Sequence, residues 1–232
     1  MTRPDDPDAA DGTNGASATT SVDGADGADG AGDADGLDGA LVPFAGYVAD
    51  DAPPLVAELA DACVRFVERA LTVRLDFTSD TLSVLDHYVA ETRKELADKP
   101  EALGLVARAV GAYFGEVVRR RVPSFWHLPS EDPAGWELQL EPVFLAFQPV
   151  AVAYDAIALG DEDGPTAAFE LEDEDRGAVE ARLGELPQVG DEEFYSLATR
   201  LEVLDIVVDA VKARMMSGGL GDVSFGPSDY ED

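Results

Sequence analysis

The stretch Glu101–Val122, EALGLVARAVGAYFGEVVRRRV, is the part of the chain around which we expect the fold to form. Its apolar residues recur at helical spacing and cover two opposite faces of the helix. One face holds Leu103, Val106, Val110, Phe114 and Val117, and the other holds Leu105, Ala109 and Ala112. A helix that is apolar nearly all round is packed on two sides. We therefore predict a buried central helix here.

Three glycines of this helix, Gly104, Gly111 and Gly115, fall on one ridge by the 3.6-residue period. A glycine lets another backbone come close, but it costs about 1 kcal/mol relative to alanine in a helix interior. We predict that these three glycines are core-structural residues against which another element packs.

Glu116 lies near Leu105, Ala109 and Ala112 on the helical wheel, where an unpaired carboxylate is costly. Arg119 and Arg120 follow three and four residues later, within reach of an ion pair. One hypothesis makes Glu116 a general acid or base, with Glu137 or Glu141 as a second carboxylate. The other makes it the buried end of a structural clamp with an arginine, with Arg120 as a core-structural residue. We favour the clamp, because buried ion pairs shift pKa values without doing chemistry.

The rest of the chain predicts an α+β fold. Apolar periodicity predicts helices over residues 55–71, 80–96, 150–159, 175–186 and 191–215, and a short strand over 72–77. Short aromatic and β-branched stretches at 124–128, 136–140 and 143–147 are typical of strands of one antiparallel sheet. We expect a single domain over residues 41–215, with three or four antiparallel strands packed against helices.

Both ends of the chain are acidic and poor in bulky apolar residues. Residues 1–40 include the near-repeat DGADGADGAGDADGLDG at Asp23–Gly39, and residues 216–232 are rich in Gly, Ser and Asp. Such segments cannot bury enough apolar surface to offset the loss of chain entropy. We predict that both are disordered tails.

The composition has 48 acidic against 16 basic residues, a formal net charge of -32. A surface this negative repels nucleic acids and anionic membranes and attracts basic proteins. The predicted partner is therefore a basic protein, with no nucleic acid and no membrane. The composition is also typical of the codon bias of a GC-rich genome, with adaptation to high salt as a rival explanation, and either one reduces the functional weight of the charge.

The sequence indicates a cytoplasmic protein. The N-terminus lacks a signal-peptide pattern, no apolar run is long enough to span a bilayer, and the single cysteine, Cys63, cannot form an internal disulfide. Cys63 lies within the apolar stripe of the helix 55–71, which favours an inert buried thiol over a nucleophile paired with His87 or His127.

No cofactor or metal site is predicted. The chain has no phosphate loop, dinucleotide fingerprint or nucleophile elbow. Two Asp/Glu-rich stretches, 33–44 and 161–172, partly match a calcium loop. The first has Leu37, Asp38 and Phe44 where a ligand, a glycine and a glutamate are needed, and the second has Pro165 and Thr166 where a ligand and a glycine are needed.

The helix 191–215 carries an unbroken 3-4-3-4 apolar seam, formed by Phe194, Leu197, Leu201, Leu204, Val208, Val211 and Met215. This spacing suits packing against one partner helix. It is interpreted either as an ordinary core helix, which we favour, or as a homodimer interface.

Two motifs resemble a bacterial protein family of unknown function. They are LDFTSDTL at Leu75–Leu82 and GAYFGEVVRR at Gly111–Arg120, followed by a hairpin that contains tryptophan. The family has an LDY or LDF start to one helix, then a helix of pattern GaYxGEvxRr and an antiparallel sheet. The resemblance covers about Leu71–Leu159 and departs at the insertion Pro129–Gly135. It implies a small α+β domain whose shared core uses Gly111, Gly115, Glu116 and Arg120.

Two functions remain in view. The leading hypothesis is a non-enzymatic interaction protein, a regulator or immunity-type inhibitor that binds a basic protein. The alternative is a small hydrolase or lyase that uses the carboxylates of Glu116, Glu137 and Glu141, with or without a divalent cation. Only the enzyme needs these groups to converge with His127 in one concave site.

Overall fold

The computed structural model describes residues 52–97, 99–160, 164–165 and 167–231. Within these residues it contains seven α-helices and four strands in one antiparallel sheet, which confirms the predicted α+β class. The helices are α1 (Pro54–Leu71), α2 (Leu82–Ala97), α3 (Pro100–Arg121), α4 (Pro149–Ala158), α5 (Asp173–Leu183), α6 (Asp191–Phe194) and α7 (Leu197–Ser217). The strands are β1 (Ser124–His127), β2 (Glu137–Leu140), β3 (Leu145–Phe147) and β4 (Glu170–Leu171). No helix in this part of the chain is long and apolar enough to cross a bilayer.

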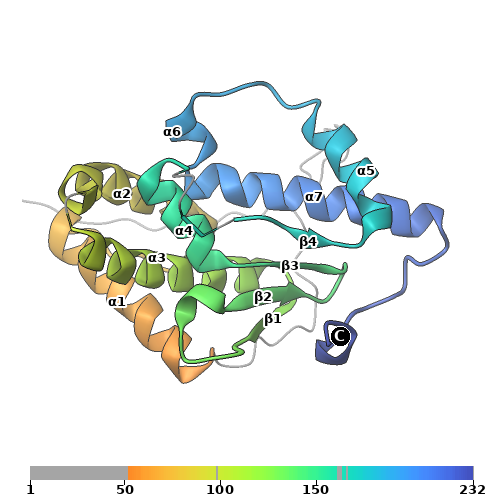
Figure 1. Cartoon of the computed structure of the whole chain (residues 1–232), viewed down its shortest axis with the longest axis horizontal. Coiled ribbons are helices and arrows are strands. Elements are labelled where there is room, and N and C mark those ends of the chain that lie inside the picture. The colour runs from red at the N-terminus through yellow and green to blue at the C-terminus, as the bar shows by residue number, and fades with distance from the viewer. Residues whose placement is uncertain (1–51, 98, 161–163, 166, 232) are drawn as a thin grey trace, which may run out of the picture. The chain divides into compact units, whose positions relative to one another are not determined.

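The sheet is a meander in the order β1-β2-β3-β4, so each strand pairs with the next one in the chain (Figure 1). Trp126 lies opposite Leu138, and Leu138 lies opposite Phe147. The helix α4 is inserted between β3 and β4. The two-residue strand β4 lies at the edge of the sheet and was not predicted, because so short a segment carries no periodic signal.

The predicted central helix is α3. Its residues from Val106 to Arg119 are buried, Arg108 excepted, and it packs against α1 on one side and α4 on another. Burial begins one turn later than expected, because Leu105 remains 52% exposed.

The strand predicted over residues 72–77 is absent from the structure. Thr72 ends α1 in the left-handed conformation with φ 59°, and Phe77 also has a positive φ of 65°. Two such positions interrupt the extended backbone that a strand requires. The side chain of Tyr113 holds this turn, since its Oη accepts a hydrogen bond from the N–H of Phe77 at 2.9 Å.

The helix predicted over 191–215 is divided into α6 and α7 at Tyr195–Ser196. Ser196 is the N-cap of α7, and its Oγ accepts the N–H of Thr199 at 3.2 Å. From Leu197 onward the apolar seam is buried within this chain, where α7 packs against α5, α2 and α4. Phe194 alone among the seam residues is exposed.

The C-terminal segment differs from the disordered tail predicted over 216–232. The ring of Tyr230 stacks on Phe144 with centroids 4.5 Å apart and meets Phe125 edge-on. Its Oη donates to the carbonyl of Leu140 at 2.7 Å and accepts from the N–H of Leu145 at 3.0 Å. Aromatic burial with a satisfied hydroxyl therefore ties this segment to the sheet. The tail predicted over residues 1–40 lies outside the described residues.

Candidate functional site

Glu116 is buried between α3 and β1, with 2% of its surface exposed. Its Oε1 accepts from Nε of Arg119 at 2.8 Å and from Nε1 of Trp126 at 2.9 Å, and its Oε2 accepts from Nη2 of Arg119 at 2.9 Å. This is the bidentate geometry of a strong charge-assisted pair. Because both oxygens are engaged and buried, Glu116 links the central helix to the sheet and is not presented to a substrate.

The arginine of this pair is Arg119, and the prediction of Arg120 as its core partner is corrected. Arg120 is exposed, and its guanidinium carbon lies 4.1 Å from the centroid of the Phe77 ring. One residue further along the helix, the side chain leaves the sheet side and reaches the turn before α2. Arg120 thus contributes a cation–π contact at the surface.

The three predicted glycines of α3 have different surroundings. A Cβ at Gly111 would lie 2.6 Å from the backbone Cα of Val150, and a Cβ at Gly115 would collide with the ring of Trp126. These two glycines therefore allow the start of α4 and the β1 tryptophan to approach the helix. A Cβ at Gly104 would meet no atom within 4 Å, so packing does not require glycine there.

His127 and Glu137 lie on the other face of the sheet from Glu116. They are directly opposite each other in the β1–β2 register, and the adjacent pair is Trp126 and Leu138. Directly opposed residues share a face and successive residues alternate. Since Trp126 faces α3 and bonds to Glu116, the sheet separates that carboxylate from His127 and Glu137.

Glu141 follows the end of β2, and its carbonyl accepts a hydrogen bond from the N–H of Phe225 at 2.8 Å. It lines a cavity of about 560 Å³ with Lys212, Met215 and Ser224 among others. Glu116, Glu137 and His127 do not line this cavity. The four residues considered for catalysis therefore do not form one site.

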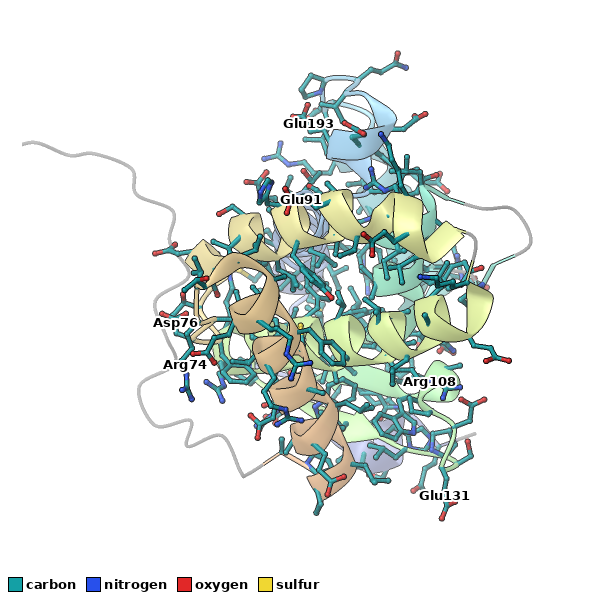
Figure 2. The ribbon with its side chains drawn as sticks, turned by 90° about the vertical axis from the view of Figure 1, so that its left-hand side faces the viewer. Arg74, Asp76, Glu91, Arg108, Glu131 and Glu193 are labelled. Atoms are coloured by element: carbon teal, nitrogen blue, oxygen red, sulfur yellow. The ribbon has the colours of Figure 1, made fainter. Side chains whose placement is uncertain are left out.

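A second cavity of about 560 Å³ lies between α1, α3 and the β1–β2 connection. Its lining combines exposed leucines with charges of both signs: Leu55, Leu105, Glu58, Arg65, Arg108 and Glu131. Figure 2 shows Arg108 and Glu131 on this side of the domain. None of the four residues considered for catalysis lines this second cavity.

The metal and thiol hypotheses find no further support. Within the described ranges, no group of three or more His, Cys, Asp and Glu side chains is placed to hold a metal ion. The first partial calcium loop lies outside those ranges, and the second does so in part, at 161–163 and 166. Cys63 is fully buried, and burial raises the pKa of its thiol far above the usual value, so the reactive thiolate is disfavoured.

A cluster of polar and aromatic side chains, which was not predicted from the sequence, joins four helices where α6 meets α7. We call this cluster the α6 corner and define it by Asp86, Arg93, Asp155, Phe194, Tyr195 and Arg200. Asp86 of α2 accepts the N–H groups of Leu197 and Ala198 at 2.7 and 3.1 Å, and so caps the start of α7. The N-terminal end of a helix carries partial positive charge, which stabilises the negative Asp86 carboxylate there.

Arg93 of α2 binds the C-terminal end of α4. It donates to the carbonyls of Ala156 and Ile157, the last turn of α4, at 3.1 and 3.2 Å, and to Glu192 of α6 at 3.3 Å. The end of α4 and the start of α7 are thereby both fixed to α2.

Arg200 of α7 lies beneath two aromatic rings, 4.5 Å from the centroid of Phe194 and 5.1 Å from that of Tyr195. Its Nη2 is 3.7 Å from Oδ2 of Asp155. Burial lowers the pKa of Arg200, and burial also raises the pKa of Asp155 although the nearby guanidinium opposes that rise. Among the described residues, Nε of Arg200 has no hydrogen-bond partner.

One aromatic ring of the α6 corner is exposed to solvent, next to the exposed carboxylates of α6. Phe194 is 45% exposed, although it rests on Arg200 and Tyr195. Figure 2 shows α6 projecting beyond α2, with Glu193 at its outer side. The available sequence signal was Ser196 with Thr199, an N-cap pattern that separates Phe194 from the buried seam.

Comparison of the chain with protein-family models, curated proteins and solved structures finds no match to any of them. The resemblance carried by the motifs at Leu75–Leu82 and Gly111–Arg120 therefore stays a prediction.

Proposed function

We propose that this protein is a non-enzymatic interaction protein that binds a basic protein partner through an acidic surface. From residue 52 onward, 36 acidic residues stand against 15 basic ones, so the excess is not confined to the N-terminal segment. Charge of one sign on a surface steers an oppositely charged partner and sets specificity. A regulator or immunity-type inhibitor of a basic protein is a function of this kind.

The main support for this proposal is that exposed carboxylates are concentrated in one segment of the chain. Between Glu170 and Glu193 the sequence has ten acidic residues and only two arginines. All of the ten except Asp175 are exposed. Asp175 is instead buried and pairs with Arg214 of α7, which fixes α5 in place. Nine solvent-facing carboxylates thus lie on one segment that is held to the domain.

The two arginines do not neutralise this surface. Arg176 pairs with Asp173 and Arg182 with Glu185, both at solvent-exposed positions where such pairs contribute little. Glu174 and Glu192 also contact arginines of other helices, Arg214 and Arg93. The exposed carboxylates of the segment outside these four pairs, Glu170, Glu172, Glu180, Asp191 and Glu193, are the ones we assign to a basic partner.

The test is affinity capture from native lysate with variants of matched charge. The first variant neutralises three carboxylates of the acidic segment, E180Q, D191N and E193Q. The control neutralises three exposed carboxylates elsewhere, Glu68, Glu95 and Glu202, by glutamine. We expect the wild type and the control to retain a stoichiometric basic protein at about 0.15 M salt, and the first variant to lose most of it.

Equal loss from both variants would contradict the proposal, because it would show attraction to net charge alone. Failure of the wild type to retain any basic protein would contradict it as well.

A further inference from the structure

Residues 184–190, which join α5 to α6, and the four residues of α6 are all exposed. We call this segment, residues 184–194, the exposed arch. Figure 1 shows this segment crossing above α7. Its sequence, GELPQVGDEEF, nevertheless contains three large apolar residues, Leu186, Val189 and Phe194, with 38%, 38% and 45% of their surface exposed. Exposed apolar residues are ordinary when scattered singly, whereas three in one short exposed segment concentrate apolar surface there.

The polar residues of the exposed arch indicate the chemistry of its partner. Glu185, Asp191, Glu192 and Glu193 lie next to the apolar residues in the sequence, and the arch contains no lysine or arginine. An apolar centre with a charged rim is the common anatomy of a protein interface. The complementary surface is apolar at its centre and carries Lys or Arg around it.

The α6 corner holds one end of the arch in place. The ring of Phe194 is supported by Arg200 and meets Tyr195 edge-on with centroids 4.9 Å apart. The hydroxyl of Tyr195 packs against Gly160, where a Cβ would collide with it, and Glu192 bonds to Arg93 at 3.3 Å. A side chain that is already positioned loses less conformational freedom on binding.

We propose that the exposed arch is the docking element of this protein, with Phe194 as its anchor. Its occupant is a basic protein that presents an apolar face flanked by Lys or Arg. This inference rests on the proposed function and adds to it the location and the apolar component of binding. Aromatic anchors on a rigid base are typical of the few residues that dominate an interface.

The test uses a defined probe with the full chain. The probe is a fluorescent helical peptide of about 18 residues, composed of Lys and Leu with all Leu on one face. A peptide of the same composition with the Leu positions permuted has the same charge and no apolar face. Binding of both peptides is measured by anisotropy at about 0.15 M salt.

We expect the wild type to prefer the amphipathic peptide, and F194A to weaken its binding by about tenfold or more. The matched control is L105A, which removes an apolar side chain of α3 that is 52% exposed, against 45% for Phe194. This control should bind as the wild type does. Hydrogen exchange should show protection of residues 184–194 when the peptide is bound.

The outcomes separate the two proposals. Equal binding of both peptides, with no effect of F194A, would show that the exposed arch is not an apolar docking element. If E192Q/E193Q then weakens binding more than E68Q/E95Q does, electrostatic binding by the acidic segment still stands. If neither peptide binds, both proposals fail. Thermal unfolding of F194A checks that the variant is folded, and Leu186→Ser gives a second test at the other end of the arch if it is not.

Discussion

The substitution Glu116→Gln distinguishes a structural from a catalytic carboxylate most directly. It removes the charge and keeps the shape, and the amide oxygen can still accept from Nε1 of Trp126. The guanidinium of Arg119, 6% exposed, then faces a neutral amide in place of a carboxylate. Of the two hydrogen bonds that now join them, the one at 2.8 Å keeps an oxygen acceptor, whereas the one at 2.9 Å is lost because the amide NH2 faces an N–H of the guanidinium.

The magnitude follows from burial. Removing one charge of a buried ion pair costs about 3–5 kcal/mol. Because the bond from Trp126 is retained, we expect the lower end, a loss of about 3 kcal/mol in the free energy of unfolding. For a chain of this size that loss lowers Tm by about 6–12 °C.

The assay is urea and thermal unfolding followed by circular dichroism, on E116Q, R119M and the double variant. Replacing both charges should recover part of the loss, with a coupling energy of about 2 kcal/mol or more. The control is R120M, which removes an exposed arginine from the same helix and should cost no more than about 1 kcal/mol. A loss below about 1 kcal/mol for E116Q, or fully additive single effects, would refute the buried clamp.

Three further predictions concern packing, ionisation and reactivity. Gly111→Ala should lower the free energy of unfolding by about 1–3 kcal/mol, because its Cβ would meet Val150, whereas Gly104→Ala should raise it by up to about 1 kcal/mol; equal effects in thermal unfolding would contradict this contrast. Burial raises the pKa of Tyr230 from 10.0 to about 12. The neutral Tyr230 therefore contributes fully to the free energy of unfolding below pH 10, the pKa in the unfolded chain, and this contribution is lost as the pH rises to the folded-state pKa of about 12. In an absorbance titration at alkaline pH, Y230F should lose one tyrosine from the late part of the curve that the wild type shows; loss of a tyrosine that titrates near pH 10 would argue against the docked C-terminal segment. Cys63 should react with a thiol reagent about 100-fold more slowly in the native protein than in denaturant, and rapid native labelling would show that its helix is not buried as described.

The parts of the fold that the sequence predicted are those with local signals. The burial of α3 follows from apolar residues that repeat within a single helix, so no knowledge of distant segments was needed. The pairing of Glu116 was predicted to within one residue. Choosing Arg119 over Arg120 required the position of Trp126, which approaches from β1 and fixes which oxygen faces which side.

The α6 corner shows why the rest was not predictable. Asp86 contacts the start of α7 across 111 residues of sequence, and Arg93 contacts Ala156 across 63. No spacing within either segment encodes such a meeting. The C-terminal segment posed a different problem: its composition is typical of disorder, and two aromatic residues, Phe225 and Tyr230, decide its docking.

The order of elements in the sheet has a consequence for how the chain folds. Because β1, β2 and β3 pair in chain order directly after α3, these elements assemble by closing short loops, and topologies rich in such local contacts fold quickly. The contact between Asp86 and the start of α7 is different, since it closes a loop of more than a hundred residues. The entropic cost of closing a loop rises only slowly with its length, by about 0.6 kcal/mol per doubling. Closing this long loop therefore slows folding more than it lowers the stability of the folded state. We therefore expect the meander and α3 to form first and α7 to dock onto them, so that the acidic segment before α7 takes its final position in that last step.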